Sequence, residues 1–338
     1  MNAEPLISIL IPFFQVEHYI ERCARSVLEQ TYQSIEFIFL DDCSSDNSLS
    51  CLMQTLDKYP ERSGQVRVIS NARNMGIAYT RNRCIEQCMG AFVFWVDADD
   101  YVSTDAIQKL VEMQRKTGAD IVTGRAVSIC QESLQEIPFS SHSSKQETLT
   151  GLLDFSIKTM LWGRLIRTAL YRDHSIQCIE GVNFREDFQV LPRLFYYADT
   201  VTDLEDVIYY YEQGNVLSYN SQAKNNIQVK LKKDLQGLES TRLIRDFFKE
   251  KEPKYNQLNE EHVVYYLREI LRDTTRSGDK ALFLKTVNEL KRCDKSIVTK
   301  YAASLLHFAQ VSPYLCWIIK RVRFFLLEPK ARQSYEKA

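Results

Sequence analysis

The first 125 residues alternate between short apolar runs and longer segments of helical length. The runs are rich in β-branched and aromatic residues, which predicts strands, and the longer segments predict helices. Nearly every position within a run is apolar, as in parallel strands that helices cover on both faces. We therefore predict an α/β domain with a doubly wound, mainly parallel sheet. The predicted strands cover residues 6–13, 35–40, 66–70, 91–96 and 120–123, and the predicted helices cover roughly 18–30, 46–58, 77–89 and 103–116.

The alternation of short apolar runs and helical segments ends in the second half of the chain. Helical patterns and one aromatic strand, VIYYYEQ, follow residue 150, and a region rich in Lys, Glu and Leu follows residue 220. We predict one main domain over residues 1–220, with a first half at 1–125 and a second half at 126–220. An α-helical accessory region is predicted over residues 221–338.

Composition and charge narrow the class of protein. The formal net charge is −1 and hydrophobic residues make up 45% of the chain, as in an ordinary globular protein, so we predict no nucleic-acid partner. The nine cysteines include no C-x-x-C pair, which favours reduced core thiols and a reducing compartment. The opening residues MNAEPLISILIPFF lack a basic region and a cleavage site, and no run of about 18 apolar residues occurs. We expect a cytoplasmic protein.

Polar side chains follow each of the first four predicted strands. In such sheets the ligand binds beyond the carboxyl ends of the strands. Any single aspartate there could cap a helix or close a turn, but five at one edge favour a binding site. These residues are Pro12, Phe14 and Gln15 after the first strand, Asp41, Asp42 and Ser44 after the second, Asn71 and Asn74 after the third, and Asp97, Asp99 and Asp100 after the fourth.

Asp97 and Asp99 are the candidate metal ligands. Alternate residues of an extended chain project to the same side, so the D-x-D pattern places two carboxylates together. Mg²⁺ and Mn²⁺ are commonly held by one or two carboxylates while substrate phosphates complete the shell. A D-x-D alone is a weak signal, and the nearby Asp41 and Asp42 strengthen it. The sequence therefore predicts a divalent-cation site for a phosphorylated ligand.

Four ordered motifs resemble those of the family 2 glycosyltransferases, which have the GT-A nucleotide-sugar-binding fold. They are SILIPFFQVEHYIERCARSVLEQTYQSIEFIFLDDCSSDNS, NARNMGIAYTRNRCI, VDADD and FREDFQVLPRLF, and the match covers roughly residues 5–215. The resemblance implies an inverting enzyme of the type that builds bacterial cell-surface glycans. It would use Mn²⁺ or Mg²⁺ to move a sugar from a nucleoside-diphosphate donor, with UDP-sugars as the expected donors, to a hydroxyl of a glycan or lipid-linked glycan. Residues 1–125 would form the donor half and 126–220 the acceptor half, and Cys43 stands where the family commonly has glycine.

The resemblance also implies roles for residues on the donor side. Phe14 would contact the nucleotide base, Asp42 would accept a hydrogen bond from the uracil imide, and Arg81 would lie near the base and the diphosphate. Asp97 would reach the ribose or the metal, and Asp99 would bind the metal directly. The implied nucleotide-binding set is Pro12, Phe14, Asp42, Asn74, Arg81 and Asp97, and the implied metal ligands are Asp99 and Asp97.

On the acceptor side, the resemblance assigns the catalytic base to Asp187. Inverting transfer needs one carboxylate within hydrogen-bond reach of the attacking hydroxyl. Glu186 would bind the acceptor or orient the site, and Asp100 and Trp162 would contact the acceptor or the donor sugar. Three simpler interpretations stay open: Asp187 caps the helix that follows, Trp162 lies in the core, and Arg81 lies on a helix surface.

Two other functions also fit an acidic site on such a sheet. A sugar nucleotidyltransferase would need a glycine-rich loop with a basic residue after the first strand, and PFFQVEHY has neither. A non-catalytic nucleotide-sugar-binding module need not keep a base, whereas Asp42, Asp99 and Asp187 are all present. We favour the enzyme.

The C-terminal segment YLCWIIKRVRFFLLEPKAR has an amphipathic helical pattern. One stripe is apolar, and the remaining arc carries Lys320, Arg321 and Arg323. Such a helix can lie in a membrane interface, and it can equally pack on the accessory helices of the protein. Contact of residues 312–327 with the inner face of the cell membrane would suit a lipid-linked acceptor.

Overall fold

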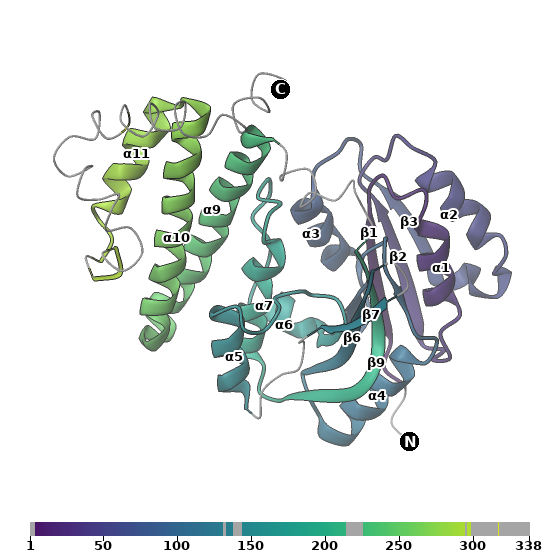
Figure 1. Ribbon diagram of the computed structural model, residues 1–338. Helices are drawn as coiled ribbons and strands as arrows, with labels where there is room; N and C mark the ends of the chain where they lie inside the picture. Colours follow the sequence, from purple (N-terminus) through teal and green to yellow (C-terminus); the bar gives the residue numbers. More distant parts are fainter. Residues whose placement is uncertain are drawn as a thin grey trace. The chain divides into compact units, whose positions relative to one another are not determined.

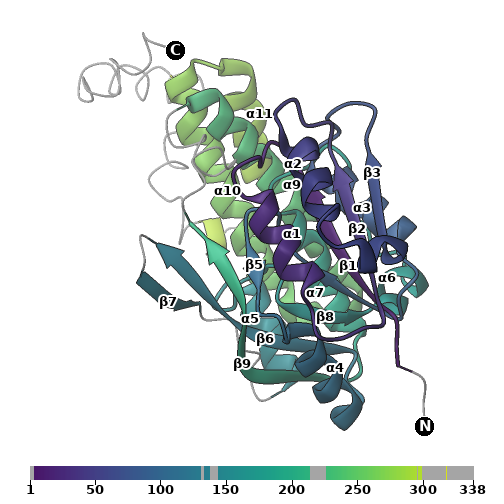
Figure 2. The same cartoon turned by 90° about the vertical axis from the view of Figure 1, so that its right-hand side faces the viewer.

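The computed structural model describes residues 4–130, 133–137, 144–213, 226–294, 296–298 and 317. The chain divides into two compact units, Met1–Gly214 and Asn215–Ala338. The first unit carries the sheet, and the described part of the second is helical (Figures 1 and 2).

The described residues of the first unit form one nine-stranded mixed sheet. Its strand order is β3-β2-β1-β4-β8-β6-β9-β5, and β7 pairs with β6. The four strands at one end of this order are parallel to one another, as their continuous apolar runs predicted. The strands are β1 (Ile7–Phe13), β2 (Ile35–Asp41), β3 (Val66–Ser70), β4 (Phe92–Trp95), β5 (Tyr101–Val102), β6 (Ile121–Cys130), β7 (Ser133–Ile137), β8 (Arg164–Arg167) and β9 (Val201–Glu212).

The sheet departs from a parallel order after β4. The fifth predicted strand begins β6, but the antiparallel strand β8 lies between β4 and β6. Because β8 comes much later in the chain than β4, no local pattern could show this pairing. β9 runs parallel to β6 and then pairs with β5, where Tyr101 lies opposite Tyr210. The aromatic strand thereby reaches the segment that follows β4.

Helices cover the parallel part of the sheet, since β1, β2 and β4 are buried along their whole length. In α1 the buried residues Cys23, Ala24 and Val27 recur at the three- and four-residue spacing of an amphipathic helix. Cys84 and Cys88 are buried free thiols. The helices of this unit are α1 (Ile20–Leu28), α2 (Ser48–Leu56), α3 (Ile77–Gln87), α4 (Ala106–Thr117), α5 (Lys145–Leu153), α6 (Thr168–Asp173) and α7 (Glu186–Tyr197).

The described part of the second unit contains the helices α9 (Ile227–Lys251), α10 (Asn256–Ser277) and α11 (Lys280–Leu290). The first two approach closely at Gly237, where an added Cβ would lie 2.4 Å from the Tyr266 ring. Across the part of the chain that the structure describes, no helix combines the length and the hydropathy needed to cross a membrane. The predicted amphipathic stripe at 312–327 lies outside the described residues, apart from position 317.

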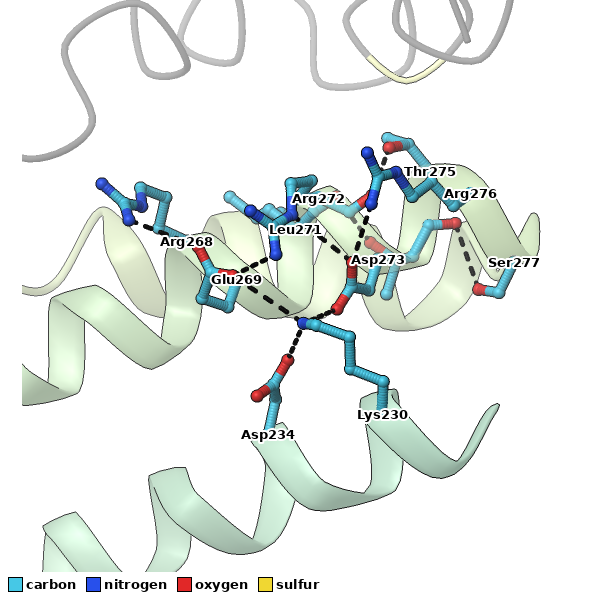
Figure 3. A network of polar contacts seen from close by, with 11 residues as sticks. Lys230, Asp234, Arg268, Glu269, Leu271, Arg272, Asp273, Thr275, Arg276 and Ser277 are labelled. Carbon is cyan, nitrogen blue, oxygen red and sulfur yellow. Dashed lines mark hydrogen bonds and ion pairs between the residues drawn. The ribbon is translucent and has the colours of Figure 1, made fainter. Parts of the chain in front are cut away.

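A charged network joins α9 to α10 (Figure 3). Lys230 on α9 donates to Asp234 at 2.7 Å and to Asp273, and it lies 3.7 Å from Glu269. The Asp273 side chain is fully buried, so this shared cation offsets a charge that water does not solvate. The arginines that approach the same two α10 carboxylates from α10 itself are Arg268, Arg272 and Arg276.

Replacing Lys230 with methionine is expected to lower the local stability of α9 and α10 by about 1–3 kcal/mol, because buried carboxylates then lack a hydrogen-bond donor. Amide hydrogen exchange of the two helices measures this effect without requiring both units to unfold together. Lys232→Met, at an exposed position of the same helix, is the matched control. Equal exchange rates in the two variants would contradict the stabilising role of Lys230.

Candidate active site

The carboxyl ends of β1 to β4 lie at one edge of the sheet, as parallel strands require. Hydrogen bonding continues beyond the strands: the Asp42 amide donates to the Phe13 carbonyl at 2.9 Å, and the Asn71 amide donates to the Asp41 carbonyl at 2.8 Å. The chain then turns at Cys43, whose φ of 63° lies in the left-handed region. Glycine enters this region freely, whereas another residue there costs about 1–2 kcal/mol.

Asp42 is buried and holds the loop that leads from β3 into α3. Its Oδ1 accepts hydrogen bonds from Asn71 Nδ2 at 2.7 Å and from the Met75 amide at 2.8 Å. Its Oδ2 accepts one from the Gly76 amide at 2.8 Å. Gly76 has a φ of 88°, which side-chain-bearing residues rarely adopt. Asp42 therefore organises residues 71–76 as well as lying at the predicted donor site.

Three other residues of the predicted nucleotide-binding set differ in exposure. Phe14 follows β1 directly and is 38% exposed, and Asn74 is exposed in the loop after β3. Pro12 is buried within β1, opposite Leu40 of β2. Phe14 and Asn74 are accessible to a ligand, whereas Pro12 is buried.

The D-x-D segment forms a turn in which Asp97 and Asp99 are half-exposed and Asp100 is fully buried. The Asp100 carboxylate accepts hydrogen bonds from the Tyr209 hydroxyl at 2.7 Å and from the Glu212 amide at 2.8 Å. Burial, together with the charges of Asp99 and Asp97, raises the pKa of Asp100 well above its ordinary value. The predicted contact of Asp100 with a sugar is therefore corrected: its carboxylate faces β9 and supports the turn.

Arg22 also holds this turn, although the sequence pattern did not single it out. Its Nη2 donates to the Asp99 carbonyl at 2.8 Å, and its Nη1 pairs with Glu212 at 3.1 Å. Its guanidinium carbon lies 4.7 Å from the centre of the Tyr101 ring. These partners are 77 to 190 residues away in the chain, so no local signal could have found Arg22.

Arg81 lies at the centre of the candidate site. Its Nη2 atom is 3.2 Å from Asp97 Oδ1, 3.2 Å from Asp187 Oδ1 and 3.5 Å from Glu186 Oε1. Its side chain is only 4% exposed, so the interpretation of Arg81 as a helix-surface residue is wrong. Burial lowers the pKa of Arg81, but the three carboxylates outweigh this effect and raise it. Within the described residues, the buried Nε and Nη1 atoms of Arg81 have no hydrogen-bond partner.

Glu186 and Asp187 form the first turn of α7, directly after Arg185, whose φ is 60°. Burial raises the pKa of Glu186 to about 8, with the Asp187 charge adding to the shift and Arg81 opposing it. Burial raises the pKa of Asp187 to about 6, and Arg81 again opposes the shift. Asp187 Oδ2 accepts a hydrogen bond from the Leu161 amide at 3.3 Å, and its Oδ1 pairs with Arg81, so both partners lie outside α7. A carboxylate with this pKa is charged at neutral pH and can accept a proton.

Trp162 is buried, as the simpler interpretation held. Its ring stacks on Tyr209 with centroids 4.3 Å apart and on Tyr211 with centroids 5.7 Å apart. The predicted direct sugar contact of Trp162 is therefore corrected, because its ring is 1% exposed. Trp162 instead packs behind Tyr209, whose hydroxyl accepts the Asp97 amide hydrogen bond at 3.0 Å.

The contribution of Glu186 and Asp187 to the stability of the folded protein is expected to fall as the pH rises from about 4 to about 8. The folded-state pKa values of Glu186 and Asp187, about 8 and about 6, lie above their ordinary values of 4.5 and 3.8. Their protonated forms favour folding, so this contribution is complete at acid pH and is lost as the pH passes through the folded-state values. Denaturant unfolding in a metal chelator, from about pH 5 to about pH 9, measures the change.

Glu186→Gln is the matching variant for this titration, because an amide does not ionise. It is expected to lose less stability than the wild-type protein between about pH 6 and about pH 8. An unchanged pH dependence would show that the Glu186 carboxyl does not titrate in this range.

Comparison of the sequence with known proteins matches residues 8–179 to "Glycosyl transferase family 2". The uncharacterized glycosyltransferase EpsJ of Bacillus subtilis is 30% identical over 217 residues, which are 62% of this chain and 62% of EpsJ. Poly(ribitol-phosphate) beta-N-acetylglucosaminyltransferase TarS of Staphylococcus aureus is 25% identical over 206 residues, which are 60% of this chain and 35% of TarS. The aligned segment therefore spans less than two thirds of either relative.

Solved structures share the fold at low sequence identity. The crystal structure of S. aureus TarS 1–349 in complex with UDP-GlcNAc has a TM-score of 0.57 and 16% identity, covering 94% of this chain and 91% of that one. Mannosyltransferase PcManGT from Pyrobaculum calidifontis, in complex with GDP-Man and Mn²⁺, has a TM-score of 0.51 and 11% identity, covering 97% and 89%. The family match over half of the sequence and the shared architecture lead to one conclusion: this chain belongs to glycosyl transferase family 2 and has the GT-A fold.

Proposed function

We propose that this glycosyltransferase is an inverting, metal-dependent enzyme that transfers a sugar from a UDP-sugar to a hydroxyl of a glycan or lipid-linked glycan. The main support for this proposal is the Arg81 cluster, formed by Arg81 with Asp97, Glu186 and Asp187. One guanidinium nitrogen lies within 3.5 Å of Asp97 in the D-x-D segment and of Glu186 and Asp187 on α7. The candidate donor residues and the candidate base therefore share one compact site.

For the donor, we propose that Phe14 contacts the base and that Asp42 accepts the imide hydrogen of uracil. The exposed ring of Phe14 supports its role, and the position of Asp42 at the edge of the sheet where β1 to β4 end supports the second. Among the described contacts, Asp42 Oδ2 accepts one hydrogen bond, and a carboxylate oxygen can accept two. Asn74 and Arg81 would bind elsewhere on the nucleotide, where the unpartnered Nε and Nη1 atoms of Arg81 are suited to oxygen acceptors.

For the metal, we propose Asp97 and Asp99 as ligands of Mn²⁺ or Mg²⁺. Both carboxylates are half-exposed at one turn, and hard oxygen ligands suit these ions. No group of three or more potential metal-binding side chains occurs among the described residues, which fits a site that donor phosphates and water complete. A bound cation there would neutralise charge on the departing diphosphate.

For the chemistry, we propose that Asp187 removes the proton from the acceptor hydroxyl. The hydroxyl oxygen forms the new bond to the anomeric carbon, while the bond from that carbon to the diphosphate oxygen breaks on the opposite face. The electron pair of the broken bond leaves with UDP, and the proton resides on Asp187. Glu186 would orient the acceptor, and Arg81 keeps Asp187 ionised by lowering its pKa against the effect of burial.

A screen of nucleotide sugars for Mn²⁺-dependent thermal stabilisation tests the proposal. A UDP-sugar present at about 100 times its Kd should stabilise the protein by about 2.7 kcal/mol. Asp99→Asn should remove the Mn²⁺ dependence. If no nucleotide sugar stabilises or is turned over by the protein, with or without Mn²⁺, the proposed UDP-sugar reaction is wrong; unchanged metal dependence in Asp99→Asn would place the metal elsewhere.

For the acceptor side, we propose contact with an anionic membrane surface at the cytoplasmic face. Residues 215–338 contain 24 Lys and Arg against 14 Asp and Glu, whereas residues 1–214 contain 19 against 30. Basic segments are attracted to anionic lipids, and residues 312–327 add the amphipathic pattern. The proposal would place the enzyme near a lipid-linked acceptor.

Co-sedimentation with vesicles tests this contact. Binding is expected with vesicles that contain anionic lipid, to weaken with salt, and to fall when residues 312–338 are deleted. Binding that is absent, or that is unchanged by the deletion, would contradict a membrane role for the segment.

A further inference from the structure

The segment 178–187, which ends in the candidate base, is attached to α3 at two places by asparagine side chains. Asn82 pairs with the backbone of Cys178: its Nδ2 donates to the carbonyl at 2.9 Å, and its Oδ1 accepts from the amide at 2.8 Å. Asn183 Oδ1 accepts from the Ala78 amide at 3.1 Å. The first attachment lies within α3 and the second at its beginning.

The Asn183 contact occurs where the donor-side loop enters α3. Gly76 precedes the first residue of the helix, and its amide donates to Asp42 Oδ2 at 2.8 Å. A Cβ added to Gly76 would lie 2.2 Å from Asn183 Nδ2, so this side chain packs directly against the glycine backbone. A continuous series of contacts therefore links the end of β2 to the segment that contains the candidate base, through Asp42, Gly76 and Asn183.

The same segment makes a sharp turn after Asn183. Arg185 has a φ of 60° and precedes Glu186 and Asp187 at the start of α7. A non-glycine residue in this conformation is strained, as at Cys43, and it persists only when its surroundings hold it. The direction of the Asp187 carboxylate thus depends on contacts that hold the backbone before this turn.

We infer that Asn183 is a positioning residue that couples donor binding at residues 71–76 to the placement of Asp187. This inference rests on the proposed function. A nucleotide base bound at Asp42 restricts the motion of residues 71–76, which Asp42 already holds by hydrogen bonds. Because Asn183 contacts Gly76 and Ala78, this restriction extends to the backbone of segment 178–187. Arg81 sets the charge of the carboxylates, whereas Asn183 sets the position of the backbone that bears them.

Amide hydrogen exchange with UDP and Mn²⁺ tests the coupling without turnover. In the wild-type protein, UDP is expected to slow exchange in residues 71–78 and in residues 178–187. In Asn183→Ala, the slowing is expected to persist in 71–78 and to disappear from 178–187. Slowing of both segments in Asn183→Ala would overturn the coupling. No slowing of 71–78 in the wild-type protein would instead contradict the proposed donor site.

Kinetics give a second readout. Asn183→Ala is expected to lower kcat by up to about 10²-fold with little change in the KM for the donor, because misplacement of a catalytic group by about 1 Å has this effect. Asn183→Asp keeps an oxygen that accepts from the Ala78 amide and should recover most of the activity. Asn82→Ala is the control, since it frees the same segment elsewhere on α3. An equal loss of kcat in Asn82→Ala would show that Asn183 only supports the fold of this segment and would contradict a specific coupling role.

A double-mutant cycle isolates the contact between the two positions. Gly76→Ala should lower kcat because the new methyl group collides with Asn183 and the backbone has a positive φ. Adding Asn183→Ala removes the collision, so the double variant should lose less activity than the product of the two single losses. Losses that simply multiply would show that the positions act independently and would contradict the inferred coupling.

Discussion

Replacing Asp187 with asparagine is expected to lower the turnover number for sugar transfer by about 10²–10⁴-fold, the usual contribution of a positioned general base. The amide has nearly the same shape and can still accept the hydrogen bond that the Leu161 amide donates at 3.3 Å. It cannot take up the proton of the acceptor hydroxyl. Affinity for UDP should remain close to that of the wild-type enzyme. Release of UDP at saturating donor and acceptor measures turnover, and calorimetric titration measures UDP binding.

Glu186→Gln distinguishes the two neighbouring carboxyls. Burial raises the pKa of both carboxyls, and the negative charge of each disfavours ionisation of the other, so one of the two is favoured as the ionised base. Asp187 lies closer to Arg81, at 3.2 Å against 3.5 Å for Glu186, and it also accepts a hydrogen bond from the Leu161 amide, which favours its ionised form. Glu186→Gln should therefore reduce turnover less than Asp187→Asn. The opposite order, with near-normal turnover in Asp187→Asn, would transfer the role of base to Glu186.

Replacing Arg81 with methionine is expected to lower the free energy of unfolding by about 3–5 kcal/mol at neutral pH, as for other buried ion pairs that lose one partner. Methionine fills part of the space but leaves Asp97, Glu186 and Asp187 without the cation they share. The deficit should shrink at acid pH, because protonated carboxyls no longer repel one another. Denaturant unfolding in a metal chelator at several pH values measures both effects.

Arg81→Lys is the matched control, since it keeps the positive charge but not the planar guanidinium. Its stability is expected to lie between those of the wild type and Arg81→Met. Arg81 lowers the pKa of Asp187, so Arg81→Met should move the acidic limb of the pH–rate profile to higher pH. A variant Arg81→Met as stable as the wild-type protein would show that the cluster does not depend on this cation.

Much of the fold could be predicted because its signals are local. Continuous apolar runs mark strands buried on both faces, and the four parallel strands β1 to β4 follow from them. Membership of glycosyl transferase family 2 favours the transferase over the two alternative functions considered from the sequence. The insertion of β8 between β4 and β6 was beyond prediction, because antiparallel pairing of distant segments leaves no periodic signal along the chain.

The candidate site could likewise be predicted only in part from the sequence. The order of residues along the chain by itself places Asp42, Asp97 and Asp99 after strands of one parallel set, since parallel strands present their carboxyl ends at one edge. Only the tertiary structure decides which of these side chains face solvent and which face the interior, as the buried Asp100 and Trp162 show. It also decides that Arg81 meets Glu186 and Asp187, more than one hundred positions later in the sequence. Side-chain burial and charge pairing depend on packing between distant segments, and that information resides in no short stretch of sequence.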